Sequence, residues 1–136
     1  MNFLLSESTV PFLPLYLDEH ETFCVVDDVD YEWASRFTWS KKLAKTGPNR
    51  KLIIYPYRTA ARVGYKYSMF LHKVICFLAH GPPPTKAHVI SDHCDGVSLN
   101  CRRGNLRWAT PSENRQNYDG AYARQLRMFS HWEKLP

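Results

Sequence analysis

The feature that most constrains the fold is the tetrapeptide TPSE at residues 110–113, because it fixes where a helix begins. Thr110 supplies an N-cap hydroxyl, Pro111 stands at the first helical position, where no N–H is needed, and Glu113 can reach back to complete a capping box. Asn114 therefore lies in the first turn of this helix.

Two extended segments, AHVISDH and NLRWA, precede the helix and are joined by DGVSLNCRRG. The Asp-Gly dipeptide at the start of this connection is a strong turn signal. The pattern therefore predicts strand, turn, strand and helix. Consecutive strand residues point to opposite faces, so Asp92 and His93 can face one ligand only if the strand ends or bulges beside them.

The preceding part of the chain predicts a small antiparallel sheet with short helices, and the fold class as a whole is α+β. Pro56 should make its strand an edge strand or interrupt it. The expected elements are a strand near Phe23 to Val26, a helix from about Asp28, extended runs on both sides of TGPNRK, a short strand near Tyr65 to Phe70, and a helix over Leu71 to Ala79.

Charge is distributed unevenly along the chain. Residues 1–35 contain eight acids and no Lys or Arg, whereas residues 36–136 hold all 18 basic residues and five acids. Eleven basic residues and no acid lie between Trp33 and Ser91. Ordinary solubilising surfaces mix both signs, so this imbalance favours a polyanionic partner, nucleic acid, over a merely solvated basic surface.

Other classes of protein fit the sequence less well. No apolar run approaches the roughly 18 residues of a membrane span, and the amino terminus lacks the basic start of a secretory signal, so we expect a cytoplasmic protein without a membrane partner. The four cysteines form no CxxC pair and are expected to be free thiols. Nothing in the sequence indicates an organic cofactor.

Asp92, His93 and Asn114 together can perform phosphodiester hydrolysis, which needs an activated water and stabilisation of developing charge. Carboxylate and amide oxygens suit Mg²⁺, which usually takes only one or two protein ligands, so we expect Asp92 and Asn114 to hold one ion. His93 is the expected general base, since an ordinary imidazole pKa is about 6.5. Asn105 is expected to hold the hairpin loop, and thereby His93, by hydrogen bonds to backbone.

The stretch from Leu71 to Asn117 resembles the HNH (His-Me finger, ββα-metal) endonucleases of the phage and homing-endonuclease type. The likeness is carried by LHKVI, GPPP, DHCDG, LN, NLRWAT and SEN, within about one third of the chain. In such nucleases the residue matching His93 activates the water, those matching Asp92 and Asn114 hold the metal, and that matching Asn105 is structural. The third motif residue is Asn here, as in many phage relatives, instead of His.

The resemblance implies a ββα-metal motif and DNA cleavage that depends on one Mg²⁺ or Mn²⁺ ion. The expected products carry 5′-phosphate and 3′-hydroxyl ends, often as a nick in one strand. It also implies the cytoplasm of a bacterial or phage-infected host cell as the location.

Three units are expected along the chain. Residues 1–69 form a sheet-and-helix DNA-contacting module, in which VDDVDYEWASRFTW and YPYRTAAR resemble the modules that accompany these nucleases. Residues 70–117 form the nuclease core with its preceding helix, and residues 118–136 form a helical or arm segment. The residues expected to contact the backbone of double-stranded DNA are Arg58, Arg62, Lys66, Arg102, Arg103, Arg107 and Arg115.

Two other functions remain as hypotheses. A catalytically inactive DNA-binding or regulatory protein could keep the same scaffold, although the joint presence of Asp92, His93 and Asn114 argues against it. A zinc-stapled interaction module lacks the paired CxxC motifs, so we do not expect structural zinc. His72 is interpreted either as a hydrogen-bond partner near the site or as a half-buried packing residue, and it is not counted as catalytic. Target sequence, cleavage of one or both strands and oligomeric state do not follow from the sequence.

Overall fold

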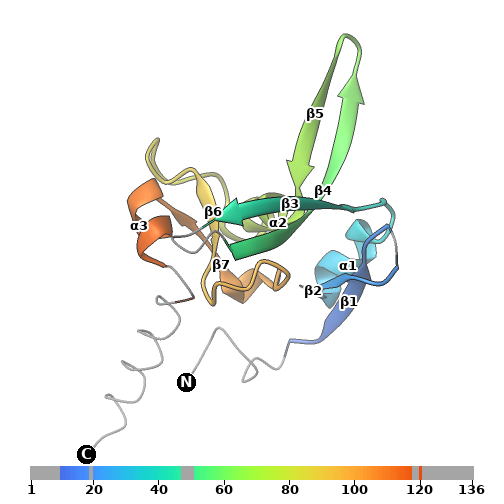
Figure 1. Ribbon diagram of the computed structural model, residues 1–136, viewed down its shortest axis with the longest axis horizontal. Coiled ribbons are helices and arrows are strands. Elements are labelled where there is room, and N and C mark those ends of the chain that lie inside the picture. The colour runs from blue at the N-terminus through green and yellow to red at the C-terminus, as the bar shows by residue number, and fades with distance from the viewer. Residues whose placement is uncertain (1–9, 19, 47–50, 118–119, 121–136) are drawn as a thin grey trace, which may run out of the picture.

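The computed structural model describes residues 10–18, 20–46, 51–117 and 120. Within these residues the chain forms small antiparallel sheets and short helices, which confirms the α+β class (Figure 1). The tip of the TGPNRK turn and, apart from Gly120, the expected C-terminal segment lie outside the described residues. No helix in the described part is long and apolar enough to cross a membrane.

The first sheet pairs β1 (Phe12–Tyr16) with β2 (Phe23–Asp27), and α1 (Asp28–Ala34) follows directly. The strand β2 and the start of α1 are where the sequence predicts them, and the first-turn acids suit the positive end of the helix. β1 was not predicted from the sequence, because its segment PFLPLY does not alternate between apolar and polar residues. In the structure only Leu15 of β1 is buried.

The second sheet has the order β3 (Ser40–Thr46), β4 (Lys51–Arg62), β5 (Tyr65–Phe70). Pro56 does not interrupt β4, which continues through it for 12 residues. β3 pairs with residues 51–57 of β4, whereas β5 pairs with residues 57–62, so Pro56 has a neighbouring strand on one side only. The missing N–H is tolerated because β4 is locally an edge at this position.

Beyond the reach of β3, the paired residues 58–62 and 65–69 form what we call the β4–β5 ribbon, which projects from the body of the molecule (Figure 1). Its turn contains Gly64 with a φ of 94°, a backbone conformation that favours glycine. Tyr65 and Lys66 are exposed on it. The ribbon has solvent on both faces there.

The carboxyl-terminal half contains α2 (Leu71–His80), β6 (Ile90–His93), the 3₁₀ turn η1 (Arg103–Asn105), β7 (Leu106–Ala109) and α3 (Pro111–Gln116). β6 and β7 form the expected antiparallel hairpin. Gly81, with a φ of 77°, ends α2, and its carbonyl accepts a hydrogen bond from Trp108 Nε1 at 2.9 Å. This bond joins α2 to β7.

One hydrophobic core joins the two halves of the chain. Burying each large aliphatic side chain contributes about 1.5–3 kcal/mol. A backbone connection reinforces the packing: Cys101 N donates to Val25 O at 2.9 Å, and Val25 N donates to Leu99 O at 2.8 Å. The core residues are Leu15, Leu17, Cys24, Val26, Ala34, Trp39, Leu71, Ile75, Cys76, Cys101 and Leu106.

Candidate active site

Asn105 lies fully buried behind the loop that connects β6 to β7. Its Nδ2 donates to Asp95 Oδ1 at 2.8 Å and to Asn100 O at 2.9 Å, while its Oδ1 accepts from Asp95 N at 3.1 Å. Cys94 N also donates to the Asn105 carbonyl at 2.7 Å. The side chain and backbone of one residue therefore hold both ends of the loop that follows His93.

His93 is the last residue of β6. The strand therefore ends beside Asp92 and His93, as expected from the sequence. Gly96 N donates to the His93 carbonyl at 2.9 Å and closes the expected turn. The side chain is 6% exposed, and burial lowers the pKa of His93 to about 4 because the charged imidazolium loses its water. At neutral pH the ring is neutral and can accept a proton.

Asp92, the residue before His93 in β6, has two side-chain hydrogen-bond partners in the described part of the chain. Its Oδ2 accepts from Arg107 Nε at 2.9 Å and from Asn117 Nδ2 at 2.9 Å. Burial raises the pKa of Asp92, and it outweighs the opposing effect of Arg107 and Asn117. The ring of Tyr55 connects the two residues: it lies 6.0 Å from the His93 ring, and the charge of Asp92 helps burial to raise the pKa of Tyr55.

Asn114 is exposed in the first turn of α3, where the capping box fixes it. The box is complete: Glu113 N donates to Thr110 Oγ1 at 3.0 Å, and Thr110 N donates to Glu113 Oε1 at 2.9 Å. The helix start predicted from TPSE is therefore confirmed. Contacts of α3 with β6 and β7 keep this turn beside the strand that carries Asp92.

Asn117, at the end of α3, is a site residue that the sequence analysis did not select. It is buried, and its Nδ2 donates to Asp92 Oδ2 at 2.9 Å, to His93 O at 3.0 Å and to Cys94 O at 3.3 Å. The available signal was its spacing of three residues from Asn114, which puts both on one helix face. The spacing does not predict which groups Asn117 contacts, because these contacts depend on how α3 packs against the hairpin.

Arg107 was expected to contact DNA, which stays a prediction, and the structure pairs it with Asp92 at 2.9 Å across the β6–β7 hairpin. Opposite charges directly across two strands are a known stabilising pair. Arg107 Nη2 also approaches the carbonyl of Glu113 at 3.5 Å. This arginine therefore orients the Asp92 carboxylate and links it to α3.

Arg102 and Arg103 were also expected to contact DNA, which stays a prediction, and in the structure both have carboxylate partners. Arg102 Nε lies 2.8 Å from Asp27 Oδ1, with side chains 11% and 8% exposed. Arg103 makes two bonds of 2.8 Å to the two oxygens of fully buried Asp30. The acids of the first segment, which the sequence analysis left without a partner, thus neutralise two of the basic residues.

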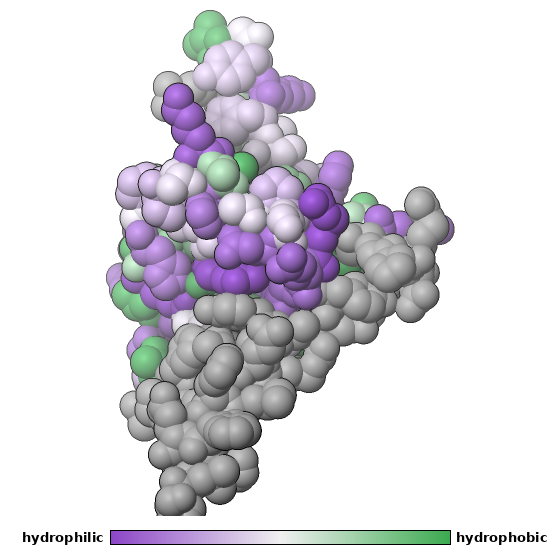
Figure 2. Space-filling model, turned by 90° about the vertical axis from the view of Figure 1, so that its left-hand side faces the viewer, coloured by the Kyte–Doolittle hydropathy of each residue, from purple (hydrophilic) through white to green (hydrophobic). Residues whose placement is uncertain are grey.

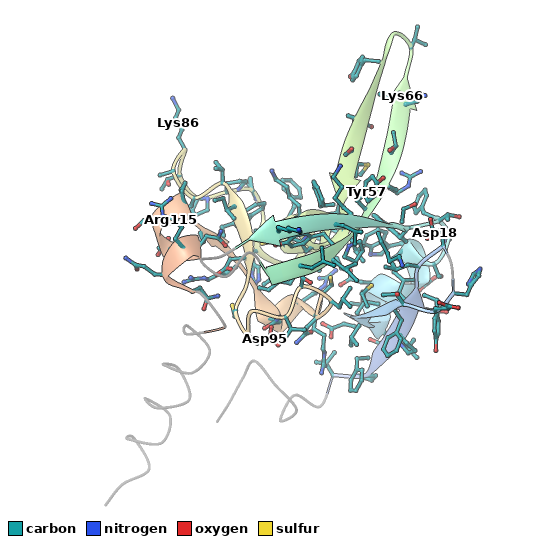
Figure 3. The ribbon with its side chains drawn as sticks, viewed as in Figure 1. Asp18, Tyr57, Lys66, Lys86, Asp95 and Arg115 are labelled. Atoms are coloured by element: carbon teal, nitrogen blue, oxygen red, sulfur yellow. The ribbon has the colours of Figure 1, made fainter. Side chains whose placement is uncertain are left out.

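The remaining expected DNA contacts differ in exposure. Lys66 lies exposed on the β4–β5 ribbon and Arg115 exposed on α3 (Figure 3). Arg58 is partly buried, with its guanidinium 4.3 Å from the ring centre of Phe37. The side chain of Arg62 lies outside the described part of the structure. Seen from the side of α3, strongly hydrophilic residues gather on the body below the ribbon (Figure 2).

The donor set suits a hydrated divalent cation. Among the described residues, no group of three His, Cys, Asp or Glu side chains could hold a metal. Mg²⁺, however, commonly uses one or two protein oxygens and keeps several waters. Both hydrogen bonds that Asp92 accepts within the described chain use Oδ2. The Asp92 carboxylate is partly desolvated and its Oδ1 takes no part in these bonds, while Asn114 presents an exposed amide on α3, a helix that contacts β6; oxygen donors of this kind fit such an ion.

Comparison with known proteins agrees with this geometry. Residues 69–116, from the end of β5 through α3, match the family model described as HNH endonuclease. Searches of curated proteins and of solved structures found no match. The matched segment contains His93, Asn105 and Asn114 in the elements described above.

Proposed function

Because residues 69–116 match the HNH endonuclease family model, and a nuclease domain implies a nucleic acid substrate, we propose that this chain is a metal-dependent DNA endonuclease. The observation that supports it best is the environment of His93. The imidazole stands at the end of a strand, burial lowers its pKa and so keeps it neutral at pH 7, and the adjacent residue is a carboxylate held by Arg107 and Asn117. A neutral base beside an oriented oxygen ligand is what phosphodiester hydrolysis needs.

In the proposed reaction His93 accepts a proton from a water molecule, and the water oxygen attacks the phosphorus. The bond from phosphorus to the 3′ oxygen breaks, which leaves a 5′-phosphate and, after protonation, a 3′-hydroxyl. Arg107 and Asn117 hold the Asp92 carboxylate through Oδ2, and Asn105 holds the loop that follows His93. A divalent ion, Mg²⁺ or Mn²⁺, held by Asp92 and Asn114 would neutralise charge on the phosphate and on the leaving oxygen.

A plasmid-nicking assay with Mg²⁺ tests this proposal by comparing the wild type with His93→Ala. We expect the substitution to remove nearly all cleavage and to leave DNA affinity within a few-fold, because a base acts mainly in the transition state. His80→Ala is the matched control, since this exposed histidine makes its hydrogen bond to the Arg103 carbonyl. Equal cleavage by wild type and His93→Ala would remove His93 from the mechanism. Binding without cleavage in either Mg²⁺ or Mn²⁺ would favour the catalytically inactive alternative.

We propose double-stranded DNA as the substrate because the shape of the β4–β5 ribbon suits a duplex. A two-stranded β-ribbon fits the major groove of B-form DNA. The β4–β5 ribbon projects from the body and carries exposed Lys66, and exposed Arg115 lies on the helix next to the site. We propose that these two residues contact backbone phosphates on either side of the scissile bond.

Lys66→Ala should weaken binding to all duplex sequences alike and reduce the slope of log affinity against log salt by about 1, since one phosphate contact is lost. Fluorescence anisotropy with a labelled duplex over a salt series measures this slope. Arg36→Ala removes the same charge from a side chain that already pairs with Glu32 at 3.7 Å, and it should leave the slope unchanged. An unchanged slope for Lys66→Ala would take the ribbon out of the DNA interface.

A further inference from the structure

Three rings from three different elements meet beside the proposed site: Tyr55 of β4, His72 of α2 and His93 of β6. The His72 and His93 ring centres lie 4.7 Å apart, and the Tyr55 ring lies 5.3 Å from His72 and 6.0 Å from His93. Of these three residues, only His93 has a role in the proposed cleavage reaction. The His72 ring lies closer to His93 than the Tyr55 ring does, and His72 has no role in that reaction.

Each of the two histidines has an enclosed nitrogen without a partner. In the described part of the chain, His72 Nδ1 and His93 Nε2 are the buried side-chain nitrogen or oxygen atoms that lack a hydrogen bond. Both nitrogens are enclosed, and a neutral imidazole ring carries one N–H and one lone pair. One unpaired donor and one unpaired acceptor can therefore satisfy each other.

The position of His72 is fixed by the fold. It is the second residue of α2, and its carbonyl accepts from Ser91 Oγ at 3.2 Å, which ties the helix start to the strand that carries His93. The ring of Phe70 lies 5.7 Å from the ring of His72. His72 is thus held next to His93 by backbone and ring contacts, independently of its own nitrogens.

Packing alone does not account for a histidine at this position. A buried polar atom left without a partner costs about 1–3 kcal/mol. The other rings around His72 belong to Tyr55, Phe70 and His93, so an apolar ring would fill the same space without that cost. A residue that is unfavourable for stability beside a reactive group indicates a functional requirement.

We propose that His72 is a positioning residue for His93. The N–H at His93 Nε2 is directed to the lone pair of His72 Nδ1, either directly after a small ring rotation or through one bridging water. This contact holds His93 in a single tautomer in which Nδ1 carries the lone pair that receives the proton from water. The role of this contact in cleavage rests on the proposed nuclease function. The tautomer of His93 that the contact selects does not depend on that function.

Two substitutions separate the nitrogen of His72 from its ring. His72→Phe keeps an aromatic ring and removes the nitrogen, whereas His72→Asn removes the ring and keeps a polar group at the δ position. We expect His72→Phe to lower kcat for nicking about 10–100-fold with KM within a few-fold, and to leave the thermal midpoint equal or higher. His72→Asn should retain most of kcat despite a lower midpoint. The opposite order, an active Phe variant and an inactive Asn variant, would show that His72 only packs.

Nitrogen-15 spectra of the histidine rings test the same proposal without any cleavage. The wild type at pH 7 should show one tautomer for His93, with the proton on Nε2, and His72→Phe should show a mixture. Signals of His93 and His72 are assigned by loss in His93→Gln and His72→Phe, and His80→Gln serves as an exposed control on α2. Identical His93 signals in wild type and His72→Phe would overturn the proposal.

The two measurements separate the proposed function from the inference. A wild type that never cleaves DNA but loses tautomer control in His72→Phe supports the positioning role and removes the nuclease function. A wild type that cleaves through His93, with normal kcat and an unchanged tautomer in His72→Phe, supports the nuclease function and removes the positioning role.

Discussion

At the scale of single residues, the environment of His93 makes the protein sensitive to acid. The folded pKa is lowered to about 4, whereas the unfolded chain keeps the ordinary value of about 6.5. Below pH 6.5 the unfolded chain therefore binds a proton that folded His93 does not. The contribution of His93 to stability is complete above pH 6.5 and is lost as the pH falls toward 4.

We expect urea unfolding to give a lower free energy of unfolding at pH 4.5 than at pH 7, and this difference should shrink by about 2–3 kcal/mol in His93→Gln. The profile of His80→Gln, which changes an exposed histidine, should overlay that of the wild type. If the wild type and His93→Gln lose the same stability on acidification, then the buried imidazole is not the group that titrates.

Residue roles could be predicted from the sequence only where a motif fixes them. His93 and Asn105 were selected by spacing, and Asn105 does hold its loop through side-chain bonds. Asn117 was missed, and the contact of Arg107 with Asp92 was not foreseen, because the contacts of both with Asp92 depend on strand register and on helix packing. Such long-range contacts leave no local signal in the sequence.

At the scale of elements, α3 shows how a short helix can be held firmly at its start. The six-residue helix Pro111–Gln116 is too short to be stable alone, so the capping box and its packing against β6 and β7 determine where Asn114 lies. Local signals of this kind predicted nearly every helix and strand. β1 escaped prediction, because it is a strand only through pairing with β2.

Thr110→Ala should destabilise the protein by about 1 kcal/mol, the usual cost of a lost N-cap. It should also raise the Mg²⁺ concentration needed for half-maximal nicking, in the same direction as, but less than, Asn114→Ala. Ser112→Ala, an exposed change inside the same turn, is the control and should alter neither property. A metal titration of Asn114→Ala that matches the wild type would remove Asn114 from the ligand set.

At the scale of the whole molecule, two ion pairs join the acidic first segment to the loop of the β6–β7 hairpin. Asp27 and Asp30 border or lie within α1, while Arg102 and Arg103 lie within the loop held by Asn105. The uneven charge of the chain therefore serves partly to connect its two halves. The sequence indicated a polyanionic partner, but it could not show that some of the basic residues bind the chain's own carboxylates.

Arg103→Ala should destabilise the protein by about 3 kcal/mol, because it leaves the buried Asp30 carboxylate without its charged partner. The double variant with Asp30→Asn should lose less than the sum of the two single variants, by about 1–3 kcal/mol in urea unfolding. The exposed pair of Glu32 and Arg36 is the matched control, and its cycle should give at most about 0.5 kcal/mol. Additive losses for Asp30 and Arg103 would mean that the pair is not coupled.

The backbone connection between Val25 and the stretch from Leu99 to Cys101 also bears on how the protein is made. Contacts between residues this far apart in sequence form slowly, since a long segment must be closed first. On the ribosome, β1, β2 and α1 emerge early, but their hydrogen-bonded partner, residues 99–101, is synthesised much later. The loop behind His93 can therefore dock on β2 only after residues 99–101 have emerged, so a product terminated before them would lack the connection between β2 and this loop.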